Sequence, residues 1–197
     1  MKKSIIIVCL AILPIAYANA QRPYYGIKAG VNSSNLTASN GGNSTDYKIG
    51  FNAGLLAHIH AGKHVALQPE INYSEQGGKV NYATSNYVAK LSYIQVPLLV
   101  QYMFGPGYRI QAGPQVSFLT SATGTTGGNV KQNIKGNYTS TDVSVSVGAG
   151  ILTNTKFGID VRWNFGLSDI NNTNTNVNVR NNVGQLSLFY MFNHRGK

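Results

Sequence analysis

The sequence predicts an all-β protein, an eight-stranded antiparallel up-and-down transmembrane β-barrel. Segments in which apolar and polar residues alternate fill the chain from Tyr25 to Phe192, and a period of two residues is typical of strands. Short turns alternate with long polar loops between these segments, as they do in outer-membrane barrels. A secretion signal precedes the first segment, so the barrel is expected to fold outside the cytoplasm.

Residues 1–20 have the features of a cleaved signal peptide. Two lysines follow Met1, an apolar core covers residues 5–15, and the small residues Ala18 and Ala20 form a cleavage motif. The apolar core is shorter than the roughly 20 residues of a membrane helix. Cleavage leaves residues 21–197 as one outer-membrane β-barrel domain and removes the only cysteine. A chain without thiols has no disulfides and no thiolate metal ligands.

The eight predicted strands are close to ten residues long, which suits tilted membrane strands. In order they are Tyr25–Asn32, Ile49–His60, Val65–Ser74, Leu91–Phe104, Tyr108–Leu119, Val143–Ile151, Phe157–Leu167 and Gln185–Phe192. No segment after the signal approaches the ~20 apolar residues of a membrane helix. A membrane location therefore requires a closed barrel, because only helices and closed barrels satisfy their backbone groups in lipid.

The connections between the strands fall into two classes. The short turns are Ala61–His64, Gly105–Gly107 and Thr153–Thr155, and the long polar loops are Ser33–Tyr47, Glu75–Lys90, Ser121–Thr141 and Asp169–Asn182. Short turns are periplasmic and long loops external in outer-membrane barrels. Eight strands then place both chain ends on the periplasmic side.

Aromatic residues mark both ends of the apolar face. Those near the short turns are Tyr25, Tyr102, Tyr108, Phe157, Tyr190 and Phe192, and those near the long loops are Phe51, Tyr73, Phe118 and Phe165. Two aromatic girdles are typical of a barrel whose apolar face contacts lipid. In a soluble barrel the apolar face would instead line a ligand pocket. That alternative explains the alternation of residues but does not explain the two bands.

Three prolines interrupt the pattern. Pro69, Pro97 and Pro114 lie at similar depth inside three consecutive predicted strands. Proline cannot donate a hydrogen bond to a neighbouring strand. We therefore expect bulges or irregular pairing at this depth.

Four charged residues are predicted to face the barrel interior. Lys28, Glu70, Asp160 and Arg162 share the inward face at a similar depth. Because buried charges need partners, we expect a structural polar layer that also includes Gln68, Gln95 and Gln111. An eight-stranded barrel has room inside only for side chains, which favours a plug over the alternative of a narrow ion path.

The sequence contains no pattern that indicates catalysis. No nucleophile lies in an arrangement with a base, and no glycine-rich phosphate loop follows a strand. His58 and His60 share one face of a strand near His64, yet interfacial histidines explain them better than a metal site. We therefore predict no catalytic residues, no cofactor and no metal. A lipid-modifying enzyme would need a Ser/His pair near the outer leaflet, whereas these histidines lie at the periplasmic end.

The long loops remain as the place for function. Thr173–Val179 keeps a period of two beyond the apolar strands. It is either a β-ribbon above the membrane, whose edge could bind a partner by strand addition, or a solvated Asn-rich loop.

Several stretches resemble a known family. They are Gly26–Asn32, Phe51–Gly54, Leu67–Tyr73, Tyr93–Tyr102, Ala112–Pro114, Gly148–Gly150 and Gly166–Ile170. With these, the chain resembles the small outer-membrane β-barrels of Bacteroidetes, described as porin-like or PorT-like. The resemblance implies an eight-stranded outer-membrane barrel without a shared enzymatic activity. In such barrels the aromatic of the last strand, here Phe192, resembles an assembly signal, although residues 193–197 extend beyond it.

Together these features predict a non-enzymatic barrel in the outer membrane that serves envelope structure or surface interaction. The alternatives are a porin-like channel and an accessory role in protein secretion, followed by a lipid-modifying enzyme or a soluble ligand-binding barrel. The expected partners are outer-membrane lipid and lipopolysaccharide, the barrel-assembly machinery during insertion, and an unidentified surface partner of a monomeric protein. The net charge of +10 falls to +8 when Lys2 and Lys3 leave with the signal, and it is scattered along a secreted chain, so nucleic acid is not expected.

Overall fold

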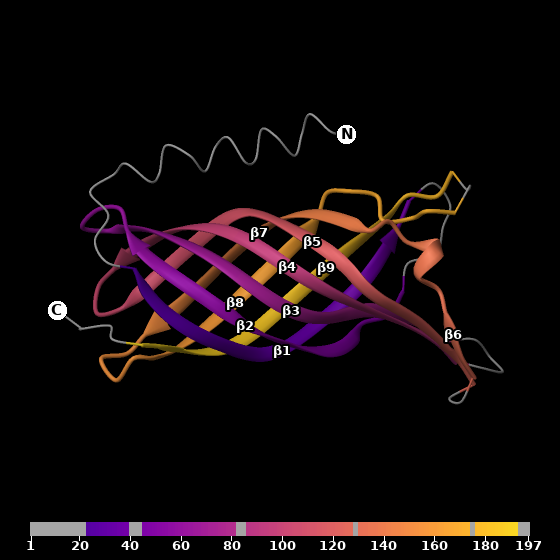
Figure 1. Cartoon of the computed structure of the whole chain (residues 1–197), viewed down its shortest axis with the longest axis horizontal. Coiled ribbons are helices and arrows are strands. Elements are labelled where there is room, and N and C mark those ends of the chain that lie inside the picture. The colour runs from indigo at the N-terminus through magenta and orange to yellow at the C-terminus, as the bar shows by residue number, and fades with distance from the viewer. Residues whose placement is uncertain (1–22, 40–44, 82–85, 128–129, 174–175, 193–197) are drawn as a thin grey trace.

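The structure is a closed β-barrel, shown in Figure 1. It is a computed structural model that describes residues 23–39, 45–81, 86–127, 130–173 and 176–192. The strands are β1 (Tyr24–Ala38), β2 (Lys48–His60), β3 (Val65–Asn81), β4 (Asn86–Phe104), β5 (Tyr108–Thr126), β6 (Val130–Asn133), β7 (Thr141–Leu152), β8 (Phe157–Gly166) and β9 (Val179–Met191), and the 3₁₀ helix η2 (Lys135–Asn137) follows β6.

Antiparallel pairing closes the barrel. The strand order is β4-β3-β2-β1-β9-β8-β7-β5-β6, and β4 also pairs with β5. The β4–β5 pairing joins eight strands into a ring, and the short β6 is an addition beside β5. The predicted eight-stranded antiparallel barrel is therefore confirmed. Its short turns gather at one end, and β6 and η2 lie at the other (Figure 1).

Among the described residues, no helix has the length and apolar character needed to cross a membrane.

The strands place apolar side chains outside and polar side chains inside. In β8 every second residue is buried from Gly158 to Gly166, while the residues between them are exposed. Phe157, the first residue of β8, is 61% exposed although it is aromatic. Aromatic rings gather near the short turns, where Tyr102 and Phe104 stack at 6.4 Å and Phe104 and Tyr108 at 6.0 Å. This distribution fits a barrel wall in contact with lipid.

Several strands are longer than the alternation of apolar residues predicts. The expected loop Glu75–Lys90 is largely a hairpin, because β3 continues to Asn81 and β4 begins at Asn86. Likewise β1 continues to Ala38 and β5 to Thr126. The prediction was too short because the outward faces of these extensions are polar, so the apolar signal ends where the lipid ends.

The β-ribbon considered for Thr173–Val179 is not formed by its described residues. Of these, only Val179 belongs to a strand, as the first residue of β9, and residues 173 and 176–178 lie outside the strands. Residues 174–175 lie outside the described part of the chain. The wall above the membrane is instead extended by β3, β4 and β5 and by the paired ends of β1 and β9, from Ser34↔Val183 to Ala38↔Val179.

The three prolines coincide with interruptions in strand pairing, as expected. The β2–β3 register passes from Leu56↔Glu70 to Ile59↔Leu67 without pairs between them, which leaves a gap at Pro69. The β3–β4 and β4–β5 registers have equivalent gaps at Pro97 and Pro114. The register is unchanged across each gap, so the prolines open the ladder without a bulge. The register shifts instead higher up, where Ser92 and Tyr93 pair with Ser121 and Leu119 and leave Thr120 of β5 as the extra residue.

Candidate functional site: the barrel interior and its outer mouth

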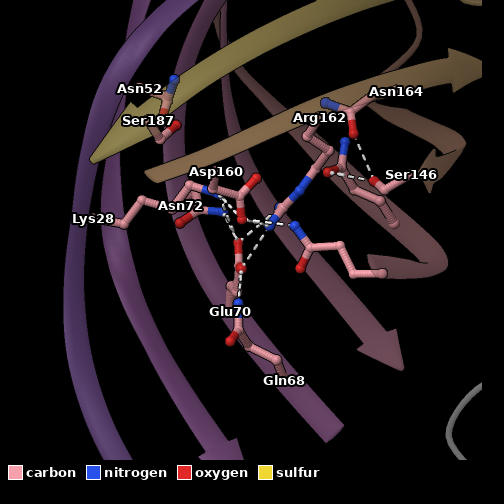
Figure 2. Close-up of polar contacts among 12 residues, drawn as sticks. Lys28, Asn52, Gln68, Glu70, Asn72, Ser146, Asp160, Arg162, Asn164 and Ser187 are labelled. Carbon is pink, nitrogen blue, oxygen red and sulfur yellow. Dashed lines mark hydrogen bonds and ion pairs between the residues drawn. The ribbon is translucent and has the colours of Figure 1, made fainter. Parts of the chain in front are cut away.

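Opposite charges meet across the middle of the barrel. The Arg162 guanidinium on β8 donates from Nη1 to Glu70 Oε2 and from Nη2 to Glu70 Oε1, both at 2.9 Å, and Nη2 also donates to Asp160 Oδ2 at 3.1 Å. Glu70 lies on β3, four strands away from β8 in the ring of eight. The bidentate pair therefore spans the full width of the interior, as Figure 2 shows.

Lys28 completes this charge layer. Its Nζ lies 3.7 Å from Glu70 Oε2 and 3.7 Å from Asp160 Oδ2. Two cations thus face two carboxylates, and all four side chains are nearly fully buried. The structure therefore brings together the four charged residues that the sequence placed on one inward face.

Amide side chains hold the layer in place. Gln68 and Asn72 donate to the two Glu70 oxygens at 2.7 and 2.8 Å. Gln111 donates to Asp160 Oδ2 at 2.6 Å and accepts a hydrogen bond from Gln101. Charge-assisted hydrogen bonds of this kind stabilise buried carboxylates.

Gln95 does not join these contacts. Its side chain is buried on the inward face, but its Oε1 has no hydrogen-bond partner among the described residues. That it supports the layer therefore stays a prediction. Asn72 and Gln101 do take part, and the same period of two would have identified them as inward-facing.

An apolar cluster closes the interior below the charge layer, towards the short turns. Leu56, Phe189 and Met191 are buried there. Arg109 places its guanidinium 4.6 Å from the centre of the Phe189 ring, which is a favourable cation–π distance. Its inward position follows from the alternation in β5, but its partner is an inward-facing aromatic, which the apolar face does not predict.

Neutral polar side chains fill the interior above the charge layer. Asn52 donates to Asn32 Oδ1 at 2.7 Å, and Ser187 donates to Asn52 Oδ1 at 3.0 Å. Asn181 on β9 donates to Gln76 on β3, which links strands three positions apart in the ring. The interior is therefore crossed at a second level.

A second apolar cluster, which the alternation of residues does not predict, closes the outer mouth. We call it the cap. Its buried members come from β1, β4, β5 and the two segments that follow β6 and β8, and they are Leu36, Ala89, Leu91, Tyr93, Leu119, Ala122, Ile134 and Ile170. The polarity of the wall thus reverses above the membrane, where inward residues become apolar. Apolar residues inside and polar residues outside are the pattern of a water-soluble core. Ile134 and Ile170 are single apolar residues in loops, so the sequence alone does not show that they belong to this core.

A shallow cavity of about 250 Å³ lies beside the cap. Its lining residues are Leu36, Ala38, Thr45, Asn137, Tyr138, Asn171, Thr173 and Val179. Tyr138 packs against the cap, and burial, together with the nearby Tyr87, raises the pKa of its hydroxyl to about 12. The hydroxyl is therefore neutral at physiological pH.

The histidines do not form a metal site in the described structure. The His58 and His60 rings lie 4.7 Å apart in an edge-to-face arrangement, and a His64 ring nitrogen lies 3.2 Å from the Met103 carbonyl oxygen. Within the described residues, no group of three or more metal-ligating side chains comes together.

The remaining singled-out residues lie at the chain ends. Phe192 immediately follows β9, and its N–H donates to the Tyr25 carbonyl at 2.7 Å. Ala18 and Ala20 lie outside the described residues, so the cleavage site stays a prediction.

Comparisons with known proteins agree with this architecture. The structure is similar to neisserial surface protein A, with a TM-score of 0.58 and 14% identity over 87% of this chain and 100% of that one. It is also similar to Ail, the attachment invasion locus protein of Yersinia pestis, with a TM-score of 0.51 and 15% identity over the same shares. At these identities the likeness concerns the fold alone. No curated protein matches the sequence.

A family model identifies the chain independently of these structures. Residues 19–172 match the outer membrane protein beta-barrel domain, which covers most of the sequence and indicates an outer-membrane location. The chain belongs to the outer membrane protein β-barrel family.

Proposed function

We propose that this outer-membrane barrel is a non-enzymatic, non-conducting protein that acts at the cell surface, in envelope structure or surface interaction. The observation that carries the proposal is that side chains fill the interior at three successive levels. The lower apolar cluster, the cross-barrel pair of Glu70 and Arg162 and the cap each occupy the lumen at a different level. A lumen filled in this way leaves the part above the membrane as the place for function.

The charge layer supports a structural role over an ion path. An ion path through this layer would need polar groups that water and ions can reach, whereas Glu70 and Arg162 are occupied by each other and by neighbouring side chains. Separating them would leave uncompensated buried charges, which is strongly unfavourable.

We further infer the topology and subgroup. Signal cleavage follows Ala20, the barrel-assembly machinery inserts the chain through its last strand and Phe192, and the barrel is monomeric. The stretches Leu67–Tyr73 and Tyr93–Tyr102 favour the Bacteroidetes-type branch of the family.

The proposal is tested in cells that lack the gene. They receive either the wild-type chain or one whose residues 173–178 are replaced by a Gly/Ser linker of equal length. Detergent sensitivity and cell–cell aggregation are then measured. The control carries the same kind of replacement at residues 61–63, in a short turn at the opposite end.

We expect the wild type and the control to restore the detergent sensitivity and the cell–cell aggregation of cells that carry the gene. The 173–178 variant should fail to restore them, although all three proteins are folded barrels in the outer membrane. Full restoration by the 173–178 variant, or failure of both variants alike, would contradict a role for the outer surface.

A further inference from the structure

The parts of β3, β4, β5 and β6 that lie above the membrane form what we call the wall extension. Lysines gather on its outward face. Lys90 on β4 is exposed and lies between the buried Ala89 and Leu91, so its side chain points away from the cap. Lys79 on β3 and Lys131 on β6 are exposed as well. We call the exposed lysines Lys79, Lys90, Lys131 and Lys135 the basic face.

Strand register places these lysines on one continuous surface. Lys79 pairs with Val88, Val88 with Thr125, and Thr125 with Lys131. Directly opposed residues of neighbouring strands point to the same side of a sheet. Lys79 and Lys131 therefore lie in one row, about 15 Å apart at the ~4.8 Å spacing of strands.

The basic face begins where the lipid-facing surface ends. The Tyr73 hydroxyl, in the outer aromatic girdle, donates to Ser92 Oγ at 3.0 Å, and Ser92 lies two residues before Ile94 and two after Lys90 on β4. The Lys135 ammonium donates to the Thr120 carbonyl at 3.0 Å, two residues beyond the exposed Phe118. At a rise of ~3.3 Å per residue and a tilt of ~40°, two residues advance about 5 Å. The ammonium groups of Lys90 and Lys135 thus lie at the level of lipid headgroups, and Lys79 and Lys131 lie farther above the membrane.

Few carboxylates offset this charge. Glu75 binds Lys48 at 2.8 Å and also Lys90, and Asp46 forms a backbone bridge with Lys79. Asp169 at this end accepts hydrogen bonds from the Asn171 and Val179 N–H groups, and Asp142 is buried. The four exposed lysines thus outnumber the exposed carboxylates Asp46 and Asp169. The surface therefore stays positive, which suits a partner with several negative charges.

We propose that the basic face binds the phosphate groups of lipopolysaccharide in the outer leaflet. The face is continuous with the lipid-facing wall, Lys90 and Lys135 lie at headgroup level, and ammonium groups bind phosphate as point charges. The inference rests on the outer-membrane location that the family indicates and is independent of the proposed surface function.

The test measures lipopolysaccharide binding to the purified, folded barrel. The temperature at which the barrel unfolds is followed as lipopolysaccharide is added in detergent, because a ligand that binds only the folded state raises it. The same lipopolysaccharide after chemical dephosphorylation serves as the second probe. The double variant Lys90→Gln/Lys135→Gln is compared with Lys63→Gln/Lys156→Gln, which removes two charges at the short-turn end.

We expect the wild type and the short-turn variant to bind alike and the basic-face variant to bind roughly tenfold more weakly or worse. Dephosphorylation should weaken binding to the wild type but change binding to the basic-face variant little. Equal affinity of the two double variants, or equal affinity of the wild type for both probes, would overturn the proposal.

Discussion

At the residue scale, the charge layer makes Glu70 the side chain on which the interior most depends. It accepts hydrogen bonds from Arg162, Gln68 and Asn72 and lies 3.7 Å from Lys28 Nζ. Removing its charge leaves two buried cations facing Asp160 alone. Breaking a buried pair by removing one partner typically costs about 3–5 kcal/mol.

Glu70→Leu is therefore expected to lower the free energy of unfolding by about 3–5 kcal/mol, measured by urea titration of the barrel in lipid vesicles. Lys63→Gln, at an exposed position of a short turn, serves as the control and should change the stability by at most about 0.5 kcal/mol, as is usual for a surface substitution. An unchanged stability of Glu70→Leu together with altered ion conductance would show that the layer is a pathway and not a plug.

Small residues beside the charge layer give a second residue-scale prediction. A Cβ at Gly54 would clash with Asn72 Oδ1 and with the Ile71 carbonyl oxygen, so an alanine there must displace the amide that binds Glu70. Gly54→Ala should destabilise the barrel by about 1–3 kcal/mol, measured by the same urea titration. Gly62→Ala is the matched control, because a Cβ added at Gly62 would meet nothing within 4 Å. Equal stability of the two variants would mean that the wall adapts without cost.

At the scale of elements, the wall extension formed by β3, β4, β5 and β6 determines which part of the chain is outside the cell. Cys9 is the only cysteine and lies in the predicted signal peptide, so a single cysteine can be introduced cleanly. Val130→Cys in the exposed β6 should react on intact cells with a membrane-impermeant maleimide, and Lys63→Cys in a short turn should react only after lysis. The reverse pattern would place the short turns outside.

The cap gives another prediction at this scale. Ile170 is fully buried in it, and its backbone N–H donates to the Val179 carbonyl at 2.9 Å. Ile170→Ala should loosen the segments above the membrane, so that limited proteolysis of whole cells cuts residues 134–139 faster. On gel electrophoresis, the folded barrel is expected to migrate differently before and after boiling. This mobility shift should persist in the variant because the part of the wall within the membrane is untouched. Loss of that shift would mean that the barrel depends on its cap.

Comparison of these elements with the sequence shows what patterns can predict. The eight strands and the four charged residues follow from a period of two, because lipid on one side and a polar interior on the other force that alternation. The extensions of β3 to β5 were missed because water lies outside them and the alternation reverses. The cap was missed because Ile134 and Ile170 come from separate loops, and only the tertiary structure brings them together.

At the scale of the whole molecule, the interior is closed at successive levels by different chemistry. Apolar residues close it near the short turns, ion pairs and amides close it in the middle, and the cap closes it at the outer mouth. The outside is apolar across the membrane and basic just above it. The barrel wall therefore presents its outer surface for function, and the filled lumen stabilises the fold.

Single-channel recording of the folded wild-type barrel in planar lipid bilayers tests this account most directly. A closed interior predicts a flat current, with no discrete conductance steps over the voltage range in which the bilayer is stable. Reproducible steps, with an ion selectivity that changes in Glu70→Gln, would show that the interior conducts and would contradict the account.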